Sequence, residues 1–129
     1  AGLGIDIAKV TEFEDEKCRQ VMSERLLAYE ESKFLQGMDP IFRSKMLATM
    51  FSLREAAVKS IADKVRNYED GGTALSGMNL TDFIVLANEN NQVGVSSRGE
   101  AVLRRIGVSR IEVAWDWCEE YVAATAIAF

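Results

Sequence analysis

The spacing of apolar residues at the start of the chain predicts a short β-strand over residues 3–10. Large apolar side chains occupy alternate positions of this segment: Leu3, Ile5 and Ile7. Gly4 and Asp6 stand between them, and this period of two is typical of a strand. A carboxylate inside a strand costs free energy if it is buried without a partner. Asp6 is therefore expected either to lie in solvent, as a hydrogen-bonded turn former at a strand end, or to be bound to something.

A helix-forming and mostly acidic stretch follows over residues 11–36 and ends at Gly37. Its candidate core residues are Phe13, Val21, Met22, Leu26, Leu27 and Phe34. Asp39 and Pro40 then predict the start of a long helix, because the first is an N-cap acceptor and the second favours the first helical position. This helix is expected to run to about Arg66, before a pair of glycines.

The long helix shows one apolar stripe at helical spacing, which is expected to face a core. The stripe consists of Leu47, Met50, Phe51, Val58, Ile61 and Val65. A second face, predicted to lie outside the stripe, carries Glu55 and Lys59 four residues apart, and Ala48 and Ser52 extend it. Taken alone, the charged pair is expected to be a surface ion pair that contributes well under about 1 kcal/mol.

The second half of the chain predicts mainly strands, after a loop over residues 71–77. The expected strands cover residues 81–87, 92–95, 111–115 and 121–129. Residues 88–91 have a composition typical of a hairpin turn, and another turn is expected near 118–120. Ser97 is expected to cap a short helix that runs through Ile106. The predicted class is α+β, a single domain over residues 1–129 with a long helix packed on a mostly antiparallel sheet.

The composition excludes several classes of protein. The chain has 129 residues, of which 48% are apolar and 27% charged, a balance typical of a globular chain rather than a disordered one. No apolar run is long enough to span a bilayer, and the first residues lack the layout of a secretory signal. We therefore expect a cytoplasmic protein without a membrane partner. Cys18 and Cys118 fit no thiolate metal spacing and are expected to be reduced, although one disulfide remains open.

The chain contains no histidine, which excludes a Ser-His-Asp triad, a Cys-His pair and any histidine-ligated metal. Any metal is therefore expected to be a hard cation, such as magnesium, manganese or calcium, bound by carboxylates and water. The net charge of −5 disfavours nucleic acid as a partner. Residues 1–40 carry a balance of −4 and residues 41–66 a balance of +4. The middle segment is thus a candidate surface for an anionic partner.

Two motifs of the chain stand out when they are taken together. The first is Gly4-Ile5-Asp6-Ile7 on the predicted strand, and the second runs from Phe51 to Lys59 on the long helix as Phe-Ser-Leu-Arg-Glu-Ala-Ala-Val-Lys. With them the chain resembles the phosphopantetheinyl transferases, and among them the short holo-(acyl-carrier-protein) synthase type. The family has a Gly-Ile/Leu-Asp-Ile/Val strand and, at about this distance, a Phe-x-x-Lys/Arg-Glu-Ala-x-x-Lys helix. Segments at residues 24–27 and 120–124 also match the family in order, so the resemblance spans nearly the whole chain.

The resemblance implies transfer of 4′-phosphopantetheine from coenzyme A to a serine of an apo acyl carrier protein, with release of 3′,5′-ADP. Asp6 and Glu55 would ligate Mg²⁺ or Mn²⁺, which suits the charge that builds on phosphoryl oxygens. Glu55 would also accept the serine proton, and Lys59 would stabilise the phosphate or the leaving group. Arg54 and Lys45 would contact the coenzyme phosphates. The resemblance also implies a homotrimer with coenzyme A in clefts between subunits.

This chain departs from the family pattern in several places. Ala114, Asp116 and Trp117 stand where many relatives have Ser-x-Ser-His or Ser-x-Thr-His, and a turn longer by one residue would place Asp116 at the histidine position. Met50 replaces a basic residue, residues 61–64 replace a glycine-rich segment, and the region expected to dock acidic carriers is itself acidic. Two hypotheses stay open: an active transferase of fatty-acid or polyketide biosynthesis, or a noncatalytic relative that acts as a trimeric structural or carrier-binding module.

Overall fold

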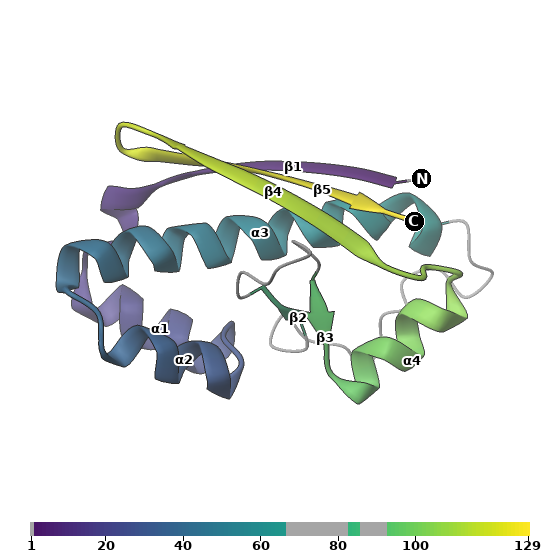
Figure 1. The fold of residues 1–129 in the computed structure, drawn as a ribbon, viewed down its shortest axis with the longest axis horizontal. Helices are drawn as coiled ribbons and strands as arrows, with labels where there is room; N and C mark the ends of the chain where they lie inside the picture. Colours follow the sequence, from purple (N-terminus) through teal and green to yellow (C-terminus); the bar gives the residue numbers. More distant parts are fainter. Residues whose placement is uncertain (1, 67–82, 86–92) are drawn as a thin grey trace.

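The computed structural model describes residues 2–66, 83–85 and 93–129. Its centre is the helix α3 (Pro40–Arg66), with a sheet on one side and the remaining elements on the other (Figure 1). The sheet contains β1 (Gly2–Lys9), β4 (Ile111–Cys118) and β5 (Tyr121–Ala128). The elements on the opposite side are α1 (Glu16–Arg25), α2 (Tyr29–Gln36), β2 (Phe83–Ile84), β3 (Gly94–Val95) and α4 (Ser97–Arg105). The predicted α+β class, with a long helix packed on an antiparallel sheet, is confirmed.

The strand β5 lies at the centre of the sheet and pairs antiparallel with both β1 and β4. The register places Asp6 opposite Ala124, which in turn lies opposite Trp115. The strand β4 extends to Cys118, beyond the predicted end, and the chain then turns through Glu119, whose φ is 54°. Asp6 therefore lies within a strand and not at its end.

The strand β1 turns its small side chains toward α3 and its large apolar side chains away from it. Gly4 is buried, whereas Leu3, Ile5 and Ile7 are 63%, 54% and 65% exposed. A Cβ added at Gly4 would collide with the carbonyl oxygen of Ala56, so the strand approaches the helix too closely for a side chain at this position. The alternation predicted for this strand is confirmed, but its apolar members form the outer face of the sheet.

The helix α3 is buried over most of its circumference. Within the predicted stripe, Leu47, Met50, Ile61 and Val65 are buried, and Phe51 and Val58 pack partly buried against the same core. Ala48 and Ser52, which were expected outside the stripe, are fully buried as well, so this part of the prediction is wrong. The reason is that α3 contacts both β1 and β5 as well as α2, and the sheet covers the face that the sequence pattern leaves polar.

The region before α3 divides into the 3-10 helix η1 (Val10–Phe13), α1 and α2. The predicted core residues Phe13, Met22, Leu26 and Leu27 are buried or half-buried. The prediction is wrong for Val21 and Phe34, which are exposed, and Leu35 is buried instead. Glu31 and Leu35 are four residues apart and share the buried face of α2, which puts Phe34 on the solvent side.

The short helix α4 is capped by Ser96 and not by Ser97, because the Ser96 side chain accepts a 3.1 Å hydrogen bond from the Gly99 amide. The helix ends as predicted, with Gly107 at φ 81°. The strands β2 and β3 pair antiparallel within the predicted runs at 81–87 and 92–95. The predicted loop at 71–77 and turn at 88–91 lie outside the described residues.

A fully buried ion pair joins α2 to α3. The Arg54 guanidinium donates to the Glu31 carboxylate and, at 2.8 Å, to the carbonyl oxygen of Phe83. The other oxygen of Glu31 accepts a 3.1 Å hydrogen bond from the amide of Val85. Burial lowers the pKa of the Arg54 guanidinium, while the charge and hydrogen bond of Glu31 oppose that shift. The pair ties residues 83–85 to both helices and depends on complete pairing, because each charge alone would be costly to bury.

We expect Gly4→Ala to lower the free energy of unfolding by roughly 1–3 kcal/mol or more, because the new Cβ collides with backbone atoms of α3. Gly37→Ala is the matched control, since nothing lies within 4 Å of a Cβ added there. Chemical denaturation measures both variants. Equal stabilities would contradict the close approach of β1 to α3.

We expect Glu31→Gln to destabilise the chain by roughly 3–5 kcal/mol, because it leaves the buried Arg54 charge without a counter-charge. Glu100→Gln is the control, because it removes the exposed pair of Glu100 with Arg104 at 3.2 Å and is expected to cost less than about 1 kcal/mol. Thermal unfolding followed by circular dichroism compares the two variants. A loss for Glu31→Gln no larger than that of the control would show that the buried pair contributes nothing.

Candidate active site

The Asp6 carboxylate faces α3 and is held by two side chains of that helix. Ser52 Oγ donates to Asp6 Oδ2 at 2.8 Å, and Lys59 Nζ donates to Asp6 Oδ1 at 2.9 Å. The same ammonium also donates to the carbonyl oxygen of Ile5 at 3.0 Å. Of the two alternatives for Asp6, a turn former in solvent or a bound carboxylate, the structure shows the second.

Glu55 lies on the same face of α3, three residues after Ser52 and four before Lys59. Its side chain is half-buried, and within the described part of the chain its carboxylate has no hydrogen-bond or ion-pair partner. The surface ion pair considered for Glu55 and Lys59 does not form, because the Lys59 ammonium lies on Asp6 instead. Ser52 and Lys59 of α3 both contact Asp6, and Glu55 lies between them in the sequence on the same helix face, so these four residues define one patch between β1 and α3.

The chemistry of this patch is that of a site with two carboxylates and one movable cation. The Lys59 side chain is 51% exposed and that of Asp6 is 14% exposed, so the patch opens to solvent on the lysine side. Across the described residues, no three acidic or cysteine side chains gather to form a complete protein metal site. A metal here would take water or substrate oxygens for its remaining ligands, which is the usual coordination of Mg²⁺.

Arg54 does not belong to this patch, and its expected contact with coenzyme phosphates is not supported by the structure. The residue directly precedes Glu55, but its side chain points to the opposite side of α3, where it is fully buried against Glu31. Successive residues of a helix point about 100° apart, so neighbours in the motif reach different surroundings. In this chain Arg54 holds the core together.

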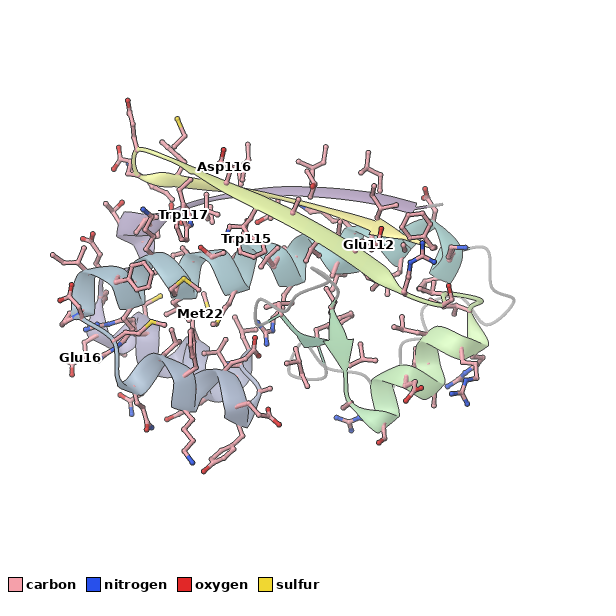
Figure 2. All side chains as sticks on the ribbon, in the orientation of Figure 1. Glu16, Met22, Glu112, Trp115, Asp116 and Trp117 are labelled. Atoms are coloured by element: carbon pink, nitrogen blue, oxygen red, sulfur yellow. The ribbon has the colours of Figure 1, made fainter. Side chains whose placement is uncertain are left out.

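Lys45 lies nearer the start of α3 than Ser52 and Glu55, and its ammonium is 4.2 Å from the centre of the Trp117 ring. The indole of Trp117 donates to Thr49 Oγ1 at 2.8 Å, and Figure 2 shows Trp115 and Trp117 between β4 and α3. Trp117 therefore packs against the helix, as expected of a tryptophan that fills core. A cation over an indole face is a favourable contact, so Lys45 and Trp117 stabilise one another.

Asp116 points away from α3, on the opposite face of β4 from Trp115 and Trp117 (Figure 2). It pairs in register with Ala123, and its carboxylate accepts a 2.8 Å hydrogen bond from the Trp117 amide. The turn after β4 consists of Glu119 and Glu120. Asp116 therefore lies on the outer face of the sheet, whereas Asp6 lies on the inner face.

Several basic side chains of the segment over residues 41–66 are bound within the chain. Arg43 donates to the carbonyl oxygens of Leu35 at 3.0 Å and Met38 at 2.8 Å, at the end of α2. Arg54 is buried and Lys59 lies on Asp6. Three of the six basic side chains of this segment are thus bound within the chain, which argues against a broad surface for an anionic partner.

Ser52 is the residue of the patch that the sequence analysis did not single out. The pattern grouped it with Glu55 on a helix face, but no motif marked it as a functional residue. Its role becomes visible only through its contact with Asp6, which lies 46 residues away. The signal available in the sequence was the Ser52 hydroxyl, which shares its helix face with Glu55 and could therefore meet an acid of the strand.

Within the described residues, no helix has the length and apolar character needed to cross a membrane. Cys18 and Cys118 both lie in the described part and form no disulfide, as expected. The open alternative of a single disulfide is therefore not supported.

A model described as the 4′-phosphopantetheinyl transferase superfamily matches residues 2–126 of the chain. A holo-(acyl-carrier-protein) synthase from Klebsiella pneumoniae is 30% identical over 135 residues, which cover 98% of this chain and 94% of the relative. A protein of the same name from Aliivibrio salmonicida is 28% identical over 131 residues, with the same coverage of both chains. The sequence similarity therefore extends over nearly the whole length of both relatives.

Solved structures show the same fold. The holo-(acyl-carrier-protein) synthase of Neisseria meningitidis has a TM-score of 0.74 at 21% identity and covers 99% of this chain and 97% of its own. The Helicobacter pylori synthase, solved in complex with coenzyme A, has a TM-score of 0.69 at 18% identity and covers 98% and 99%. Because the family match and the fold likeness cover the same residues, the chain belongs to the 4′-phosphopantetheinyl transferase superfamily.

Proposed function

We propose that this chain is a holo-(acyl-carrier-protein) synthase, which transfers 4′-phosphopantetheine from coenzyme A to a serine of an apo acyl carrier protein and releases 3′,5′-ADP. The observation that carries the proposal is the contact of Asp6 with Ser52 and Lys59, on the face of α3 that also carries Glu55. The names of the two relatives and the coenzyme A complex of the Helicobacter pylori structure support the same reaction.

The residues of the patch fit a divalent cation. The ammonium of Lys59 is a cation bound to Asp6 Oδ1, and Glu55 carries a half-buried carboxylate on the same face of α3, one helical turn before Lys59. Mg²⁺ in phosphoryl-transfer sites is commonly bound by one or two carboxylates, with waters and substrate phosphates completing its shell. We infer that Asp6 and Glu55 hold Mg²⁺ or Mn²⁺, and that this ion, when bound, offsets the charge that develops on the pyrophosphate.

The side chains of the patch then have different roles in the transfer. The serine oxygen of the carrier attacks the phosphorus of the phosphopantetheine moiety while the bond from that phosphorus to the 3′,5′-ADP oxygen breaks. Glu55 accepts the proton of the serine. Lys59 places its charge on the phosphate oxygens of the departing group. Lys45 is the second candidate for the coenzyme phosphates, since its flexible chain lets the ammonium move off Trp117.

The outer face of β1 supports association between copies of the chain, and a homotrimer is the assembly that the family resemblance implies. Leu3, Ile5 and Ile7 of β1 are more than half exposed, and their partners across the register on β5 include Ile127, which is also exposed. A contiguous apolar face of this kind marks an interaction surface in a soluble domain. Three copies that bury this face would also bring β1 of one subunit near its neighbours, which is compatible with coenzyme A bound between subunits.

We place the enzyme in the cytoplasm, where the free thiols of Cys18 and Cys118 would stay reduced. The alternative function is a noncatalytic, trimeric module that binds a carrier protein without modifying it. What favours this alternative is the loss of family side chains: Met50 is buried core, and Trp117 packs on α3 at the position of the family histidine.

We expect Glu55→Gln to slow the transfer by at least about 100-fold, because the proton acceptor and a metal ligand are lost together. Mass spectrometry of an apo acyl carrier protein incubated with the chain, coenzyme A and Mg²⁺ measures the gain of one phosphopantetheine group. Glu100→Gln on α4 is the control and is expected to keep the full rate. A stable complex of the unmodified chain with the carrier, without any mass gain, would support the noncatalytic module.

We expect Ile5→Arg to dissociate the trimer, because it places a charge in the centre of the apolar face of β1. Ile41→Arg is the matched control, since Ile41 is also an exposed isoleucine but belongs to the start of α3 and not to the sheet. Sedimentation velocity reports the mass of both variants. If Ile5→Arg keeps the mass of the unmodified chain, the sheet face is not the interface.

A further inference from the structure

We infer that Ser52 is a positioning residue for the Asp6 carboxylate, an inference that rests on the proposed function. Ser52 Oγ donates a 2.8 Å hydrogen bond to Asp6 Oδ2. The serine is fully buried in the middle of α3, so water does not compete for its hydroxyl. The bond therefore fixes Oδ2 from a buried position, and Oδ1 is the oxygen held only by the half-exposed Lys59.

The other buried hydroxyls of α3 behave differently from Ser52. Ser44, Thr49 and Ser60 donate to the backbone carbonyl oxygens of Pro40, Lys45 and Ala57 respectively. A bond to a carbonyl three or four residues earlier is the ordinary choice of a serine or threonine inside a helix. Ser52 bonds to the strand acid instead, which directs its hydroxyl toward the site and not toward its own helix.

The two donors to Asp6, Ser52 and Lys59, also differ in how firmly their side chains are held in place. Lys59 reaches Oδ1 through a long, half-exposed side chain, whereas Ser52 reaches Oδ2 through one rotatable bond from a buried position. A divalent cation bound to Asp6 would repel the ammonium at close range. A cation bound at Oδ1 would take the place of the Lys59 ammonium, and Ser52 would be the donor that still holds the carboxylate.

The expected contribution of Ser52 to metal affinity follows from the fixed orientation that the Asp6 carboxylate would lose without it. The terminal torsion of an aspartate is broad, so without a partner the carboxylate samples many orientations. Hydrogen-bond partners of metal ligands typically contribute 10- to 100-fold to metal affinity or activity. Ser52 is expected to contribute within this range.

The test compares Ser52→Ala with Ser60→Ala, its matched control. Both variants remove a buried serine hydroxyl from α3, but the Ser60 hydroxyl bonds only to the backbone of its own helix. Mn²⁺ binding is followed by electron paramagnetic resonance in the absence of substrates. We expect Ser52→Ala to weaken Mn²⁺ binding by about 10- to 100-fold and Ser60→Ala to change it less than about twofold.

A second measurement separates positioning from a loss of folded protein. The transfer rate of Ser52→Ala is expected to recover toward that of the unmodified chain as Mn²⁺ is raised, which a damaged fold would not show. If the unmodified chain binds Mn²⁺ and both variants bind it equally well, Ser52 is a structural residue and only this inference fails. If the unmodified chain itself binds no Mn²⁺, the metal site of the proposed function fails, and this inference fails with it.

Discussion

The close approach of β1 to α3 is the constraint on which the rest of the structure depends. Gly4 allows it, because any Cβ at that position would meet the carbonyl oxygen of Ala56. At this separation a short aspartate side chain on the strand reaches both Ser52 and Lys59 of the helix. The Gly-x-Asp order of the strand is therefore a packing requirement and a chemical one at the same time.

The same approach explains why the outer face of β1 is apolar. Since only small side chains fit between β1 and α3, the large ones of the strand must point away from the helix. A single chain leaves Leu3, Ile5 and Ile7 in water, which is unfavourable for a strand otherwise well suited to burial. Assembly through this face would bury these side chains. The close packing of β1 on α3 and the tendency of the chain to form an oligomer therefore have the same physical cause.

Several charged side chains of this chain stabilise its fold and do not belong to the candidate active site. Arg54 and Glu31 are buried together and connect α2 and α3 to residues 83–85. Arg43 holds the carbonyl oxygens at the end of α2. Side chains that are adjacent in the family motif, Arg54 and Glu55, thus take opposite roles, one in the core and one at the site.

The sequence by itself predicted most of the elements and marked Asp6, Glu55 and Lys59 as the candidate reacting residues. The caps and glycines around α3 predicted its bounds, because these signals act locally, and the spacing of Asp6, Glu55 and Lys59 matched a family pattern. The tertiary structure alone decided which face of each element is buried. The burial of Ala48, the outward side of Ile5 and the partner of Arg54 depend on neighbours distant in the chain, and no local pattern specifies which neighbour covers a face.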